Sequence, residues 1–237
     1  MVERFFLALD YETTKDAHTH GSSTLFGLCT RYGPKFVDRY FGVKINEDLL
    51  MGAIDPDLKR FKTIFADKKI SHGADTGSRI LKRLAEDLGP RYVTVSANLG
   101  HSILRKYVEE ARKYGMDIIA WTVHTKTSPE DAQKMYKRPL NDVILNLAEM
   151  AWGAGCHAVV LEAGMLEDER IRELPIKKLV TGIRIDPSDK GSQKRVSSLE
   201  EVAKMKEAIN YAVISSRYLE DIEATTQIVE ALKPREV

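Results

Sequence analysis

The chain has 237 residues, of which 43% are hydrophobic and 30% are charged, and these values predict one globular domain over residues 1–237. The 36 Lys and Arg residues nearly balance the 35 Asp and Glu residues, so the net charge of +1 offers no positive field for nucleic acid or an anionic membrane. Because the apolar runs are far shorter than the roughly 20 residues of a membrane span, and the first residues lack a secretory pattern, we expect a cytoplasmic protein without membrane or nucleic-acid partners.

Eight short runs of β-branched and aromatic residues alternate with amphipathic stretches, which is typical of strand and crossover-helix units in a parallel sheet. The expected strands are Phe5–Asp10, Tyr40–Ile45, Thr63–Lys69, Tyr92–Ala97, Asp117–Val123, Ala158–Leu161, Leu179–Ile183 and Tyr211–Ser215. Runs such as FFLALD and YAVISS are apolar throughout, as strands covered on both faces should be. The pattern predicts an α/β protein with a single (β/α)8 TIM barrel. An open doubly wound sheet is the alternative, but no Gly-rich phosphate fingerprint follows the first strand.

The sequence also predicts where several helices begin and end. Glycines stand where a helix should end in the left-handed conformation, at Gly89, Gly115 and Gly155. Ser198 precedes two acidic residues and is expected to cap the helix that follows. The segment from Glu12 to Val37 is longer than one helix needs, and the polar stretch Thr19–Ser23 predicts a break within it.

The cysteines and tryptophans all lie in apolar surroundings. Cys29 and Cys156 show no metal-ligand spacing, so we expect two small buried side chains and no disulfide. Trp121 and Trp152 are expected to pack in the core or against helices, with Trp121 lining a pocket if it points into the barrel.

Charged residues terminate the first three expected strands, where the active site of a TIM barrel lies. They are Asp10, Lys44, Asp67 and Lys69, and strand alternation places the last two on the same side. Each charge would find an opposite neighbour in a network of these four side chains. From spacing alone, a catalytic array and a set of solvated ion pairs at the barrel rim are equally good interpretations.

The motifs LALD, GVK, D-K-K-x-x-x-x-x-D-T, T-G-I-R and a late S-R resemble the orotidine 5'-phosphate decarboxylase family nearly from end to end. Asp67, Lys69 and Thr76 match three places of the family's third-strand motif, D-x-K-x-x-D followed by N-T. The stretch from Thr122 to Thr125 resembles its T-V-L-T strand.

The resemblance implies decarboxylation of orotidine 5'-monophosphate to uridine 5'-monophosphate, without metal or organic cofactor. It implies a catalytic set of Lys69 as proton donor, Asp67, Lys44 and His72. The implied substrate-binding residues are Asp10, Lys44, Thr76, Thr125, Gln193 and Arg217, the last two for the phosphate of a small phosphorylated substrate. It also implies a homodimer whose subunits share residues between their active sites.

His72 departs from the pattern, because it stands where the family has the second acid of D-x-K-x-x-D. Two other functions therefore stay open. One is a sugar-phosphate lyase resembling hexulose phosphate synthase or ketogulonate phosphate decarboxylase, which bind magnesium through an acid ending the second strand. Here Lys44 stands at that place and would repel the metal. Glu47 lies just beyond it, as a metal ligand or as an exposed glutamate at the start of a helix. The other is a barrel that binds a nucleotide phosphate without turning it over.

Overall fold

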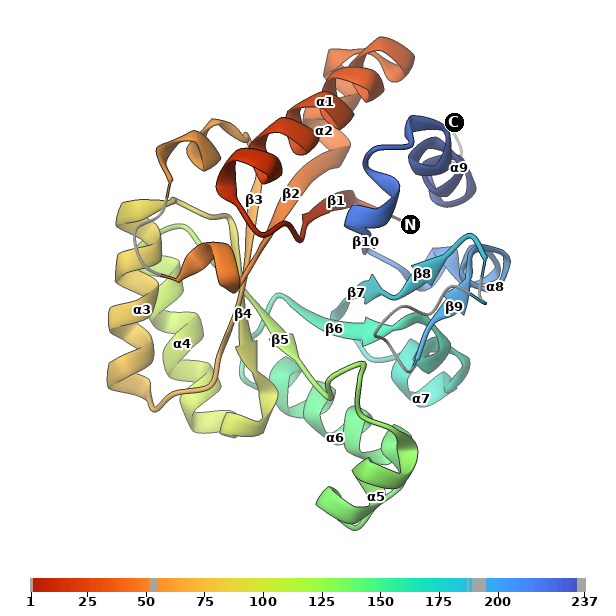
Figure 1. The fold of residues 1–237 in the computed structure, drawn as a ribbon. Helices are drawn as coiled ribbons and strands as arrows, with labels where there is room; N and C mark the ends of the chain where they lie inside the picture. Colours follow the sequence, from red (N-terminus) through yellow and green to blue (C-terminus); the bar gives the residue numbers. More distant parts are fainter. Residues whose placement is uncertain (1, 52–54, 187, 189–194, 234–237) are drawn as a thin grey trace.

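The computed structural model describes residues 2–51, 55–186, 188 and 195–233. Eight parallel strands close into a barrel in the order β1-β10-β7-β6-β5-β4-β3-β2 (Figure 1). The strands are β1 Arg4–Leu9, β2 Phe41–Asn46, β3 Ile64–Ile70, β4 Tyr92–Ser96, β5 Asp117–Trp121, β6 Ala158–Glu162, β7 Lys177–Thr181 and β10 Tyr211–Ile214. The predicted TIM barrel is confirmed, and each expected strand overlaps one of these eight.

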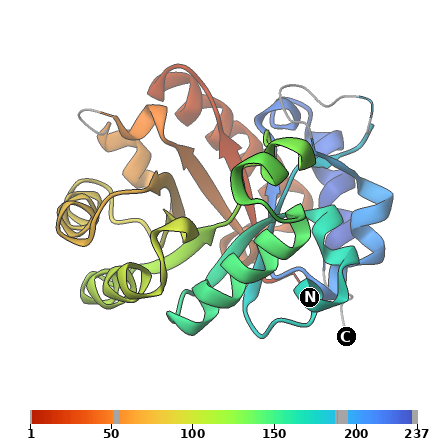
Figure 2. The same ribbon diagram turned by 90° about the horizontal axis from the view of Figure 1, so that it is seen from below.

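Helices surround the barrel on its outside (Figures 1 and 2). The α-helices are α1 Thr14–Tyr32, α2 Pro34–Tyr40, α3 Ala74–Asp87, α4 His101–Lys113, α5 Pro129–Tyr136, α6 Leu140–Gly153, α7 Glu169–Arg172, α8 Leu199–Lys204 and α9 Ile222–Leu232. Short 3-10 turns are η1 Asp48–Leu50, η2 Pro56–Arg60, η3 Ala97–Leu99, η4 Ala163–Glu167, η5 Lys206–Ala208 and η6 Ser216–Tyr218. None of the helices in the described ranges is long and apolar enough to span a membrane.

Aromatic and aliphatic side chains together fill the interior of the barrel. The ring of Phe6 lies 5.2 Å from that of Phe65, 5.5 Å from Tyr92 and 6.0 Å from Tyr211, measured between centroids. These four side chains belong to a buried cluster distinct from the larger core between strands and helices. Aromatic packing of this kind gives the barrel a rigid floor beneath the carboxyl ends of the strands.

The predicted break at Thr19–Ser23 is wrong, because α1 runs without interruption for 19 residues. Gly21 serves close packing instead: a Cβ at this position would come within 3.0 Å of both Leu9 and Phe61. The chain turns only at Gly33, whose φ of 84° separates α1 from α2. The polar and small residues thus fit one helix tightly against the barrel, which their composition alone cannot distinguish from a break.

The predicted helix ends are confirmed. Gly89, Gly115 and Gly155 adopt φ values of 64°, 70° and 83°. Ser198 forms a capping box with Glu201 at the start of α8.

Between β7 and α8 lies a feature that the sequence did not signal. A second, two-stranded sheet pairs β8 Ile183–Arg184 with β9 Ser197–Ser198.

The cysteines and Trp152 can be compared with the predictions as well. Cys29 and Cys156 are free thiols, as predicted, although Cys29 is only half-buried. Trp152 is 51% exposed, which excludes the core, one of the two places predicted for it.

Candidate active site

A cavity of about 340 Å³ opens at the carboxyl ends of the barrel strands. One side is formed by the four charged residues that the sequence singled out, Asp10, Lys44, Asp67 and Lys69. Trp121 also lines the cavity, the position that the sequence allowed for it if its side chain pointed into the barrel. This is the end of the fold at which TIM barrels place their active sites.

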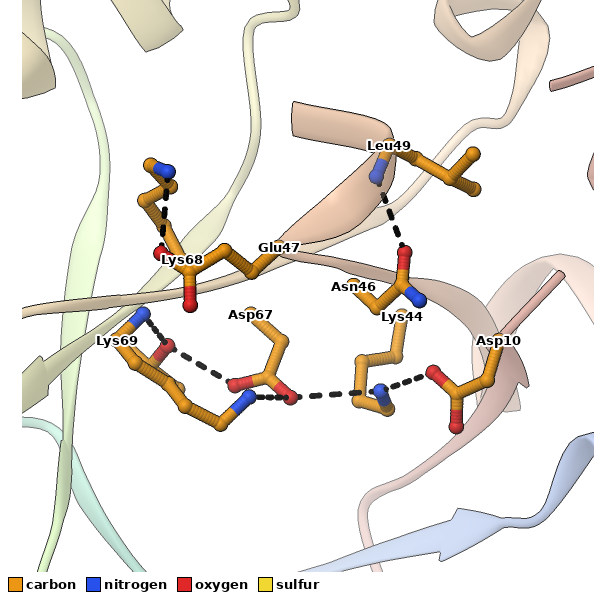
Figure 3. A network of polar contacts seen from close by, with 9 residues as sticks. Asp10, Lys44, Asn46, Glu47, Leu49, Asp67, Lys68 and Lys69 are labelled. Carbon is orange, nitrogen blue, oxygen red and sulfur yellow. Dashed lines mark hydrogen bonds and ion pairs between the residues drawn. The ribbon is translucent and has the colours of Figure 1, made fainter. Parts of the chain in front are cut away.

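The four charges form a continuous row from β1 to β3 (Figure 3). The Nζ atom of Lys44 lies 2.8 Å from a carboxylate oxygen of Asp10 and 3.4 Å from Oδ2 of Asp67. The same Oδ2 lies 2.8 Å from Nζ of Lys69. The predicted network therefore exists, with carboxylates and ammonium groups alternating along it.

Burial increases toward the middle of the row. The side chains of Lys44 and Asp67 are 10% and 15% exposed, whereas that of Lys69 is 32% exposed at the cavity. Burial alone would raise the pKa of Asp67, but the positive charges of Lys44 and Lys69 outweigh it and hold this pKa below its ordinary value. Burial would likewise lower the pKa of Lys44, yet Asp67 and Asp10 keep it above the ordinary value. The buried pair is therefore fully ionised at neutral pH.

An irregularity at the end of β3 places Lys69 beside Asp67. The pairing of β3 with β4 shifts register between Ala66 and Ile70, and Lys69 adopts a φ of 50°, which is rare outside glycine. Thr94 on β4 is fully buried and holds this conformation: its Oγ1 accepts the backbone N–H of Lys69 at 2.8 Å and donates to Asp67 at 3.0 Å. Strain stored at such a position is typical of functional sites.

The same irregularity turns Lys68 away from the row. Its Nζ lies 3.2 Å from Oε1 of Glu47, outside the cavity (Figure 3). Glu47 is thus engaged with a lysine, and it does not face Asp10 or Asp67 across an open position. The residues that the structure describes contain no group of three or more His, Cys, Asp or Glu side chains able to hold a metal ion.

The opposite side of the cavity is also polar, and its residues are not among those predicted from the sequence. His124 follows β5, Glu162 ends β6 and Arg184 lies in β8, and all three line the cavity. Glu162 and Arg184 are buried, with exposed fractions of 6% and 3%. Glu162 could have been found from the sequence, because it directly follows an expected apolar strand. Asp10 was predicted as a site residue because it stands at the end of such a strand.

His124 stands among positive charges. Partial burial together with the charges of Lys69 and Lys126 lowers the pKa of this imidazole. Its Nδ1 atom accepts a hydrogen bond from the backbone N–H of Lys126 at 3.1 Å. A neutral ring with this contact carries its proton on Nε2.

Of the remaining predicted site residues, some line the cavity and others do not. Thr125 lines the cavity. His72 is exposed in the turn before α3 and Thr76 lies in the first turn of that helix, and neither belongs to the cavity lining of this chain. Arg217 is exposed in η6, next to Ser215 of the lining. Gln193 lies outside the described residues.

Comparison with known proteins identifies the class to which this barrel and its charged cavity belong. Residues 3–218 match the model of the orotidine 5'-phosphate decarboxylase / HUMPS family. The match covers nearly the whole barrel, and the chain belongs to this family.

Solved structures share the fold at low sequence identity. A crystal structure of an uncharacterized conserved protein from Geobacillus kaustophilus has a TM-score of 0.69 and 17% identity, covering 97% of this chain and 100% of that one. Orotidine 5'-phosphate decarboxylase from Lactobacillus acidophilus has the same TM-score and 18% identity, covering 98% and 100%. Orotidine 5'-monophosphate decarboxylase from Methanocaldococcus jannaschii, complexed with the inhibitor BMP, has a TM-score of 0.69 and 17% identity, covering 99% and 100%.

Proposed function

We propose that this protein decarboxylates orotidine 5'-monophosphate to uridine 5'-monophosphate. The observation that carries the proposal is the row Asp10–Lys44–Asp67–Lys69, whose last ammonium group faces the cavity of a barrel from this family. The buried pair Lys44 and Asp67 in the middle of this row costs desolvation energy, and apolar residues would fill the same space at little cost to stability. Its presence at the catalytic end of the barrel therefore favours a role in chemistry.

The chemistry requires a positive charge beside a developing carbanion. When the bond between the pyrimidine ring and its carboxylate breaks, carbon dioxide leaves and the electron pair remains on the ring carbon. Nζ of Lys69 stabilises this charge and then donates a proton to the same carbon. Asp67, 2.8 Å from that Nζ, positions it, and Lys44 keeps Asp67 ionised from the other side. Asp10, at the exposed end of the row, and Lys44 beside it are suited to bind the ribose hydroxyls.

The phosphate is proposed to lie near the ends of β7 and β10. Arg217 lies three residues after the end of β10, and a guanidinium there is suited to clamp a phosphate group. The proposal assigns Gln193 and Thr125 to the same substrate, and His72 and Thr76 to the neighbouring site of a homodimer. Binding at the phosphate would organise the reacting end through contacts remote from it.

Lys44 favours this reaction over a magnesium-dependent sugar-phosphate lyase of the same family. A divalent cation in the row would need the oxygens of Asp10 and Asp67, and the Nζ atom of Lys44 lies between them at 2.8 and 3.4 Å. The ammonium group occupies the place of such a cation and would repel it. The residues of this row do not fit a resident metal ion.

The direct test follows the loss of orotate absorbance when purified protein is mixed with orotidine 5'-monophosphate. We expect turnover by the wild-type protein and its loss, by at least a thousandfold, in Lys69→Ala, which removes both the positive charge and the proton donor. Lys68→Ala is the matched control, because the neighbouring Lys68 points to Glu47 outside the cavity. Absence of turnover together with calorimetric binding of uridine 5'-monophosphate would replace the proposal with a nucleotide-binding barrel.

A further inference from the structure

Glu162 is a carboxylate that the proposed reaction does not use. It ends β6, is 6% exposed and lines the cavity. In the closed barrel β6 lies across from β2, the strand that carries Lys44. Glu162 therefore faces a bound ligand from the side opposite the charged row.

Among the described residues, hydrogen bonds reach only one oxygen of this carboxylate. Oε1 accepts hydrogen bonds from the hydroxyl of Ser197 at 2.5 Å and from the backbone N–H of Gly164 at 2.8 Å. Oε2 accepts none from the described residues. The side-chain polar atoms that are buried without a partner belong to Tyr11, Trp121, Arg195 and Thr226 in the part of the chain described. Oε2 is not among them, so it is not sealed off from solvent, and Glu162 lines the cavity.

The charge of Glu162 also lacks a direct counter-ion among the described side chains. Arg195 is near enough to interact electrostatically, but its Nη2 donates to the carbonyls of Val123 and His124 instead. A carboxylate oxygen can only accept hydrogen bonds, and a ligand that fills the cavity displaces water from Oε2. The ligand must then present a donor to Oε2, because an oxygen left without a partner in a filled site is costly.

We propose that Oε2 of Glu162 selects substrates by accepting the ring N–H of a pyrimidine imide. This inference rests on the proposed function, because orotate and uracil rings carry such an N–H between two carbonyl groups. A site built around an acceptor rejects an analogue that lacks the donor, since its buried oxygen is then left unpaired. Glu162 is thus a specificity-determining residue on the side of the cavity opposite the charged row.

The test is a cycle of two proteins and two ligands, measured by calorimetry. The ligands are uridine 5'-monophosphate and 3-methyluridine 5'-monophosphate, in which a methyl group replaces the ring N–H. In Glu162→Gln the N–H of Gly164 retains the amide oxygen at the Oε1 position, and an NH2 group replaces Oε2. Because Gln has the shape of Glu, the steric effect of the methyl group cancels between the two proteins.

We expect the wild-type protein to favour uridine 5'-monophosphate over the methylated ligand, and Glu162→Gln to reduce that preference by roughly tenfold to a hundredfold. The reduction comes from weaker binding of uridine 5'-monophosphate, with the methylated ligand little changed. Glu47→Gln, the same substitution outside the cavity, is expected to keep the wild-type preference. Circular dichroism spectra confirm that the variants are folded.

Three results would overturn the inference. If uridine 5'-monophosphate binds and Glu162→Gln keeps the wild-type preference, Glu162 does not read the ring, and the proposed function stands. If Glu47→Gln lowers the preference as much, the effect is one of charge and not of contact. If the wild-type protein does not bind uridine 5'-monophosphate at all, the proposed function fails together with this inference.

Discussion

Replacement of Thr94 by Val isolates the contact that holds Lys69 in its unusual backbone conformation. Val has nearly the shape of Thr but lacks the hydroxyl, so Thr94→Val leaves the backbone N–H of Lys69 and one oxygen of Asp67 without their partner. Thr94 is fully buried, and water cannot replace its hydroxyl without repacking. Both the stability of the barrel and the placement of Lys69 should suffer.

The expected loss follows from the two bonds. A hydrogen bond between neutral groups contributes about 1 kcal/mol, and one to a carboxylate contributes about 1.5–3 kcal/mol. Together they predict that Thr94→Val lowers the free energy of unfolding by about 3 kcal/mol. The left-handed conformation of Lys69 costs roughly 1–2 kcal/mol by itself, so without Thr94 the chain has a reason to relax to an ordinary strand.

Urea denaturation followed by circular dichroism measures the loss, provided that the slope with urea concentration is the same in all variants. Thr94→Ser, which restores the hydroxyl, serves as the control and should recover most of the stability. Decarboxylation of orotidine 5'-monophosphate by Thr94→Val should fall at least tenfold, because the reacting Nζ loses its position. A stability loss below about 1 kcal/mol combined with wild-type activity would refute this account of Lys69.

Two further substitutions test the packing and the pH dependence of the fold. In Gly77→Ala the new Cβ would lie 1.9 Å from the ring of the fully buried Tyr107. We expect urea titrations to show that the free energy of unfolding falls by about 2–3 kcal/mol, with partial recovery when Tyr107→Leu is added. Full stability of the single variant would contradict this packing. Burial lowers the pKa of His157, which bonds to the hydroxyl of Tyr211 at 2.7 Å, although Asp117 acts in the opposite direction. The native state then holds fewer protons on this ring than the unfolded chain, so stability should fall as the pH drops below 6.5, by at most about 1.4 kcal/mol per unit of pKa difference. His157→Gln should lose less stability over that range, and an unchanged pH profile of thermal unfolding would count against the assignment.

The sequence predicted the strands and the charged row for the same reason. Strands buried on both faces need continuous apolar runs, so their limits are visible in composition, and the polar residue after each run marks the carboxyl end. Asp10, Lys44 and Asp67 were found in this way, and a parallel barrel brings all such ends together. Glycine caps were predictable because only the left-handed conformation requires them.

Other features depend on contacts between segments that are distant along the chain. Thr94 lies inside an apolar strand, and nothing local reveals that its hydroxyl meets a register shift in the neighbouring β3. Gly21 was interpreted as a break because the residues it packs against, Leu9 and Phe61, are far away in the sequence. The orientation of Glu162 depends on the hydrogen bond from Ser197 to its Oε1, and the sequence did not predict the strand that carries Ser197.

By itself, therefore, the sequence determined the eight strand and helix units, the closed parallel sheet and the row of charges at its carboxyl end. Hydrophobic periodicity and the residues at strand ends are local properties, and they survive any small error in helix limits. Only the tertiary structure decided how Lys69 is held, which oxygen of Glu162 remains open to the cavity, and which predicted residues lie away from it. These depend on hydrogen-bond geometry between strands, where a shift of one residue exchanges a side chain that faces the cavity for one that faces the helices.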